Sequence, residues 1–212
     1  MRTRSGRQGA DLRAVHRRLS SRDLALVASF AALIAVLGLP GSIQLFGNAV
    51  PITLQTLGVM LAGSVLGWKR GALSVLVLLL LVAAGLPLLS GGRGGLAVFA
   101  GPSAGYLCGF VLGAAVTGWL VERRLPAYPA WWGALANVVG GVGAVYLVGI
   151  PVQAAVLGTS GLLATALSAM LFLPGDAIKV VIATTVAAAV HRGYPGITEP
   201  RRGVERESAG SR

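Results

Sequence analysis

The sequence predicts an all-α membrane protein with six transmembrane helices. Of its 212 residues, 55% are hydrophobic and only 12% are charged, whereas soluble proteins carry about 25% charged residues. Between Leu24 and Val190 the chain has only eight formally charged residues. This stretch is long enough for six spans of about 20 residues with short connections. A water-soluble domain is therefore disfavoured.

Gly, Pro and charged residues divide this stretch into the expected helices, which cover residues 23–39, 52–67, 71–85, 103–121, 131–150 and 174–191. The third helix is short for a span. The segment 151–173 is apolar but interrupted by Gly158, Ser160 and Gly161. It predicts a half-helix or lid packed against the bundle, because irregular backbone at membrane depth must be covered by protein.

The basic residues predict the orientation of the bundle. Sixteen of the 18 lie before residue 23, in the turn after the second helix, in the loop after the fourth, or at the end of the chain. Such residues stay cytoplasmic. We expect a basic cytoplasmic arm (1–22), a six-helix membrane domain (23–192) and a charged cytoplasmic tail (193–212) in the cell membrane. The net charge of +11 then favours anionic lipid, rather than nucleic acid, as a partner.

Asp176 and Lys179 are charged residues that a position in a loop does not account for, since both fall in the last span. Their i, i+3 spacing places them on one helix face, and Pro174 and Gly175 mark the helix start just before them. A charge at this depth costs about 2.5–3.5 kcal/mol and is usually functional. The pair is either an internal salt bridge or a polar pocket for a ligand with N–H donors and a C=O acceptor, such as an amide or a urea.

A glycine-rich external loop, residues 91–95, surrounds Arg93 between the third and fourth helices. Its glycines, among them Gly94 and Gly95, allow the backbone to fold tightly over a ligand, and Tyr106 follows at the start of the fourth helix. Arg93 is either a solvated residue of a flexible turn or a clamp for a ligand carboxylate.

Other polar residues in the spans allow two interpretations. Gln55 is a candidate for lining a pocket at the external start of the second helix, whereas capping or inter-helix hydrogen bonding is favoured for Thr56. Asn137 is expected to join helices. Tyr146 is either an interface aromatic or a pocket wall.

The first helix carries small-xxx-small pairs, which allow close helix approach. Such a face serves packing within the bundle or docking of a partner membrane protein. Its residues are Ala28, Ala31, Ala32 and Ala35.

Several activities are disfavoured by what the spans lack. They contain no histidine cluster, no acidic pair and no nucleotide-binding motif. We therefore expect no metal, no cofactor and no ATP hydrolysis by this chain. An intramembrane enzyme with Asp176 as acid or base, and a simple channel, are weaker alternatives.

In order along the chain, the segments VPITLQTLG (50–58), LSGGRGGL (89–96), GPSAGYLCGF (101–110), YLVGIP (146–151) and FLPGDAIK (172–179) resemble the BioY family. These are the biotin-binding S components of energy-coupling factor (ECF) transporters. The resemblance covers about residues 24–191. One departure is Ser103-Ala104, where the family pattern has Thr-Gly.

The resemblance implies high-affinity capture of biotin from the external side. Delivery would require an ECF transmembrane coupling protein and cytoplasmic ATPases, with the alanine face of the first helix meeting the coupling protein. Asp176 would accept from the ureido N–H groups of biotin, Lys179 would donate to its polar atoms, and Arg93 would bind its carboxylate or gate the site. Gln55, Gly94, Gly95, Tyr106 and Tyr146 would complete the ligand site. An S component for another vitamin is the main alternative.

Overall fold

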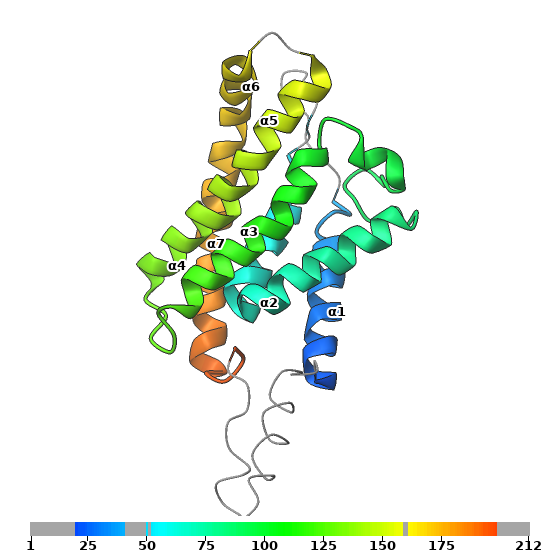
Figure 1. The fold of residues 1–212 in the computed structure, drawn as a ribbon. Coiled ribbons are helices and arrows are strands. Elements are labelled where there is room, and N and C mark those ends of the chain that lie inside the picture. The colour runs from blue at the N-terminus through cyan, green and yellow to red at the C-terminus, as the bar shows by residue number, and fades with distance from the viewer. Residues whose placement is uncertain (1–19, 41–49, 51, 159–160, 199–212) are drawn as a thin grey trace, which may run out of the picture.

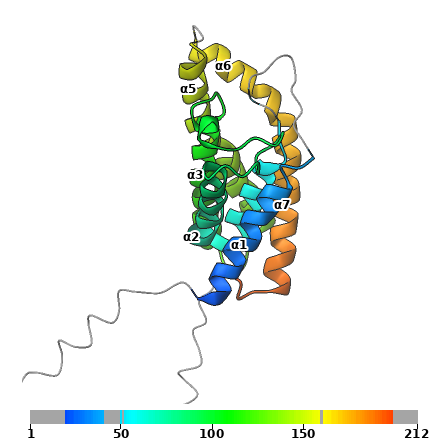
Figure 2. The same cartoon turned by 90° about the vertical axis from the view of Figure 1, so that its right-hand side faces the viewer.

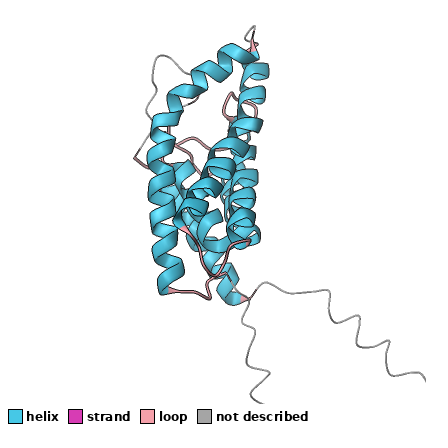
Figure 3. Cartoon of the chain, turned by 90° about the vertical axis from the view of Figure 1, so that its left-hand side faces the viewer, coloured by secondary structure: helices cyan, strands magenta, loops and turns pink. Residues whose placement is uncertain are grey.

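The computed structural model describes residues 20–40, 50, 52–158 and 161–198, and all its regular elements are helices (Figures 1 and 3). This confirms the all-α prediction. Most of the expected basic arm and charged tail lies outside the described residues. The elements are α1 (Ser21–Val36), α2 (Gln55–Ala83), the 3-10 turn η2 (Leu96–Phe99), α3 (Ala104–Glu122), α4 (Ala130–Ala136), the π-helical segment η3 (Asn137–Ala144), α5 (Val145–Leu157), α6 (Leu162–Ala169), the 3-10 turn η4 (Met170–Phe172) and α7 (Leu173–Gly193).

Four helical runs of the described chain are long and apolar enough to cross a membrane. They are Gln55–Ala83, Ala104–Glu122, Ala130–Leu157 and Leu162–Gly193. α1 is shorter, at 16 residues, and its first turn is fixed by a capping box between Ser20 and Asp23. The structure thus supports a multi-pass membrane protein.

The expected helices 52–67 and 71–85 correspond to the two helical arms of α2, which folds back on itself at Gly67. A straight helix of its length would separate its ends by about 43 Å, yet the Gln55 side chain hydrogen-bonds to Leu88 and Ser90 just beyond the other end. Gly67 has φ +82° and ψ −179°, a conformation essentially restricted to glycine. Glu122 of α3 accepts a 3.0 Å hydrogen bond from the Trp68 amide, which satisfies a backbone group at the break.

The expected helix end at residue 150 and the irregular segment 151–173 need correction. α5 continues through Pro151 to Leu157, where Gly158 ends it with φ +59°. The short helix α6 then connects α5 to α7 through η4, and Figure 2 shows it arching across one end of the bundle. The short helix α6, of eight residues, thus lies in the segment where a half-helix or lid was expected.

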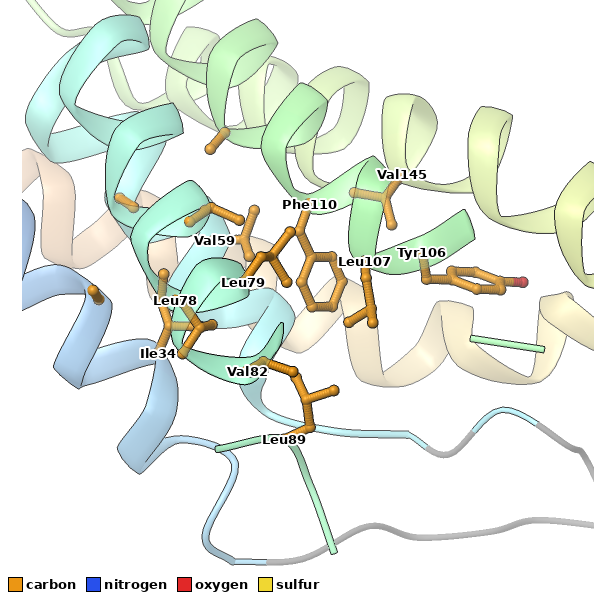
Figure 4. Close-up of a cluster of buried hydrophobic side chains, with 14 of the residues drawn as sticks. Ile34, Val59, Leu78, Leu79, Val82, Leu89, Tyr106, Leu107, Phe110 and Val145 are labelled. Carbon is orange, nitrogen blue, oxygen red and sulfur yellow. The ribbon is translucent and has the colours of Figure 1, made fainter. Parts of the chain in front are cut away.

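The main core lies between α1, α2 and α3 and extends to α5 (Figure 4). Ile34, Leu78 and Val82 are fully buried within it. α2 and α3 approach closely at Gly63, where an added Cβ would stand 2.6 Å from the Ala114 carbonyl oxygen.

Asn137 joins three helices, as the sequence predicts. Its Oδ1 accepts from Ser64 of α2 at 3.0 Å, and its Nδ2 donates to Thr184 of α7 at 3.3 Å. All three residues are buried, so the network fixes the relative positions of α2, η3 and α7.

Replacing Gly67 with alanine is expected to destabilise the protein by at least about 1–3 kcal/mol, the usual cost of this backbone conformation. The new Cβ would also collide with Glu122 Oε1. The control is Gly193→Ala, where no heavy atom lies within 4 Å and φ is not positive. Thermal unfolding of detergent-purified variants measures the difference; equal midpoints would contradict the assigned role of Gly67.

Candidate ligand-binding site

A cavity opens among the start of α2, the 89–93 loop, the start of α3, the η3–α5 junction and the start of α7. It encloses about 580 Å³ of empty space, part of it open to solvent. Its walls are formed by Val50, Ile52, Thr53, Gln55, Thr56, Leu89, Arg93, Ser103, Tyr106, Leu107, Phe110, Val145, Tyr146, Phe172, Asp176 and Lys179.

The Asp176–Lys179 pair forms the charged part of the wall. Lys179 Nζ lies 3.0 Å from Asp176 Oδ1, and the two residues are only 4% and 5% exposed. Asp176 sits in the first turn of α7, where the helix dipole favours an anion. Burying either charge alone would be costly, so each charge offsets part of the cost of burying the other.

Two neighbouring helices hold the pair. Tyr146 donates its hydroxyl hydrogen bond to Asp176 Oδ2, and Lys179 donates to Thr56 Oγ1 at 2.8 Å. The pair thus presents an acceptor and a donor side by side, and both are oriented by α2 and α5. Thr56 also forms the inter-helix hydrogen bond expected of it.

Three aromatic rings stand edge to face beside the charged pair. The ring centroids of Tyr106, Tyr146 and Phe172 lie 6.2–6.4 Å apart, a favoured aromatic geometry. The Tyr106 hydroxyl donates to Gln153 Oε1 at 2.8 Å. The cavity therefore has a rigid apolar wall next to its charged groups.

Gln55 holds the glycine-rich loop against the bundle. Its Oε1 accepts from the Ser90 amide at 3.2 Å and its Nε2 donates to the Leu88 carbonyl at 3.1 Å. The loop turns at Gly91 and Gly92, with φ values of +77° and +69°, as in the tight turns of hairpins. Gln55 lines the cavity with its amide already bonded to the loop backbone.

Arg93 follows this turn and reaches the cavity wall. Its Nε donates to the Ser90 carbonyl at 3.1 Å and its Nη1 to Ser103 Oγ at 3.3 Å. No carboxylate among the described residues lies within 4 Å of it. The guanidinium is therefore held in place with no anionic partner from the described part of the chain.

The structure brings six of the sequence-predicted residues to one cavity: Asp176, Lys179, Arg93, Gln55, Tyr106 and Tyr146. Gly94 and Gly95 lie in the loop but outside the cavity wall. A Cβ on Gly94 would collide with the Leu86 carbonyl oxygen, so this glycine permits backbone packing. The sequence did not identify Phe110 and Phe172 as cavity residues, because an apolar side chain that lines a cavity has no sequence signal that separates it from other apolar residues of a span.

The four alanines of α1 do not share one environment. Ala28 and Ala32 are exposed, whereas Ala31 is buried in the core and Ala35 is half-buried against it. The single docking face that included Ala31 therefore needs correction, since that side chain packs inside the bundle.

The ion pair predicts non-additive stability changes. Lys179→Met leaves a buried carboxylate without its cation and is expected to cost about 3–5 kcal/mol, whereas the double variant Asp176→Asn/Lys179→Met is expected to lose much less than the two single variants together. Denaturant unfolding in detergent, without ligand, measures this cycle. Strictly additive losses would show that the two groups are not coupled.

The BioY family profile matches residues 11–196 of the chain. The biotin transporter BioY of Rhizobium etli is 50% identical over 184 residues, which cover 84% of this chain and 97% of that protein. The biotin transporter BioY of Rhodobacter capsulatus is 45% identical over 186 residues, covering 82% and 95% respectively.

A solved structure shares the fold. The crystal structure of the S-component for biotin from an ECF-type ABC transporter matches with a TM-score of 0.76 and 32% identity, over 81% of this chain and 91% of that one. The family profile spans most of the sequence, and both relatives exceed 30% identity over nearly their whole length. This chain therefore belongs to the BioY family.

Proposed function

We propose that this chain is the biotin-binding S component of an ECF transporter and serves biotin uptake. The observation that carries the proposal is the buried Asp176–Lys179 pair in the wall of a cavity that is also lined by aromatic side chains. The BioY relatives named as biotin transporters support biotin as the ligand. The role is binding and transport, not catalysis.

The polar end of the cavity suits the ureido ring of biotin. That ring has two N–H donors and one carbonyl acceptor in a plane. Asp176 accepts from the N–H groups, and Lys179 donates to the ligand's polar atoms. Because Tyr146 and Thr56 already orient these two side chains, binding requires little reordering of the site.

The rest of biotin suits the other walls. The fused ring and the valerate chain contact the aromatic wall of Tyr106 and Phe172, and the valerate carboxylate pairs with Arg93. An arginine that lacks an anionic partner suits a carboxylate because its planar N–H groups bind both oxygens. The bonded Gln55 amide acts indirectly, by fixing the loop that carries Arg93.

Transport requires an energy source that the sequence does not provide. We infer that biotin enters from the external side and that delivery uses an ECF coupling protein with cytoplasmic ATPases, as the solved S component belongs to an ECF-type ABC transporter. Both termini are cytoplasmic in this arrangement, and the chain spans the cell membrane. Ala28 and Ala32, the exposed alanines of α1, form the face that meets the coupling protein.

Biotin titration of the purified protein tests the ligand and the site together. Asp176→Asn and Lys179→Ala are each expected to weaken binding by about 10- to 100-fold, the usual effect of losing a charged hydrogen bond. Ile178→Ala, on the exposed side of the same helix turn, is the matched control and should bind as the wild type does.

Two results would contradict these assignments. Unchanged affinity in both site variants, with folding verified by circular dichroism, would exclude the assigned site. Binding of thiamine or riboflavin at low concentration, with biotin inert, would instead favour an S component for another vitamin.

Arg93 is tested by comparing biotin with its neutral carboxamide. Wild-type protein should bind biotin about tenfold more tightly than the amide, and Arg93→Gln should remove this preference. Asp176→Asn should keep the preference while weakening both ligands. If Arg93→Gln kept the full preference, Arg93 would not be the carboxylate partner.

A further inference from the structure

The four tryptophans of the chain gather at one end of the bundle. Trp68 follows the Gly67 break, Trp119 lies in the last turn of α3, and Trp131 and Trp132 begin α4. These positions are adjacent, because Glu122 at the end of α3 bonds to the Trp68 amide and the Trp132 indole donates to the Leu120 carbonyl. Figure 1 shows this end at the lower side, with the start of α1 and the end of α7.

Basic side chains accompany these rings. The Arg123 guanidinium carbon lies 3.4 Å from the ring centroid of Trp119, and that of Arg124 lies 4.8 Å from Trp132 and 5.9 Å from Trp131. Lys69 Nζ stands 5.2 Å from the Trp68 ring. Aromatic faces attract such cations, and arginine stacks on them best.

Arg123 and Arg124 are exposed and keep their N–H groups available. Within the part of the chain that the structure describes, neither forms an ion pair with a carboxylate. A guanidinium stacked on a ring still presents its donors in its own plane, where they can bind two oxygens of one anion. The rings thus orient both side chains and leave their N–H groups able to bind an anion.

The surface continues into the lipid-facing side of the bundle. Along α3, exposed Cys108 and Leu112 share a stripe with Trp119 and Arg123. Along α4 and η3, exposed Leu135, Val138 and Val139 extend from Trp131 in the same way. In a membrane these apolar residues contact acyl chains, so the arginines lie at the level of the headgroups.

We propose that Arg123 and Arg124, with Trp119, Trp131 and Trp132, bind the phosphate of an anionic phospholipid whose acyl chains cover the adjoining apolar stripes. The charge, the stacked geometry and the continuity with an acyl-covered surface together favour a phospholipid over a soluble anion. The site lies at the end opposite the biotin cavity's loop, so it does not depend on the identity of the transported ligand.

Tryptophan fluorescence provides a local test, because every tryptophan of the chain lies at this end. Purified protein is reconstituted in vesicles of phosphatidylcholine and phosphatidylglycerol. In one set of vesicles the phosphatidylglycerol carries bromine near the headgroup as a quencher, and in the other set the phosphatidylcholine carries it. Wild-type protein should be quenched preferentially by the brominated phosphatidylglycerol. Arg123→Gln/Arg124→Gln should lower this preference by up to about 30-fold, which corresponds to about 1 kcal/mol for each of the two basic residues at a membrane surface.

Two further variants separate an ordered site from diffuse charge. Arg22→Gln/Arg192→Gln removes two exposed charges at the same end and should keep the preference. Arg123→Lys/Arg124→Lys keeps the charge but loses flat stacking, and should show an intermediate preference. An equal loss in the Arg22/Arg192 variant, or full retention in the lysine variant, would overturn the proposal. Equal quenching of wild-type protein by the two lipids would also overturn the proposal, and would favour a protein partner for this surface.

Discussion

The buried ion pair between Asp176 and Lys179 constrains the rest of the ligand site. Each charge would be expensive in the interior of a membrane domain without the other, and each also requires a second partner. Tyr146 of α5 and Thr56 of α2 supply these partners. The pair therefore fixes how α2, α5 and α7 approach one another, and the cavity is the space left between them. A site that is ordered before its ligand arrives loses little entropy on binding.

A second constraint is the reversal of α2 at Gly67. Because α2 reverses at Gly67, its first residue meets the chain that follows its last turn, and Gln55 bonds to Leu88 and Ser90. That contact orients the glycine turn and places Arg93 at the cavity. One glycine conformation, stabilised by Glu122 across the α2–α3 interface, thus determines where a cation in a distant loop lies. The charged residues proposed to bind the two ends of the ligand, Asp176 with Lys179 and Arg93, thus reach the cavity through separate parts of the fold.

Much of the site could be predicted because charge is rare in these spans. Asp176, Lys179 and Arg93 are conspicuous once the charges expected on the cytoplasmic side are set aside, and all three line one cavity. Apolar and backbone features were harder to predict. Nothing in an apolar run distinguishes Phe110 as a cavity residue from any other phenylalanine. The break at Gly67, in contrast, coincides with the end of the expected helix 52–67. Pro151 does not end α5, since membrane helices tolerate proline, and the burial of Ala31 depends on how α1 packs.

The central claim is that the ureido end of biotin binds to Asp176 and Lys179, the acceptor and the donor on α7. A structure of the purified chain with biotin bound tests this most directly. The account predicts ureido nitrogens within about 3.2 Å of the Asp176 carboxylate, Lys179 on a polar atom of the ligand, and the valerate carboxylate at Arg93. Biotin bound outside this cavity, or with its ureido ring away from Asp176, would contradict the account.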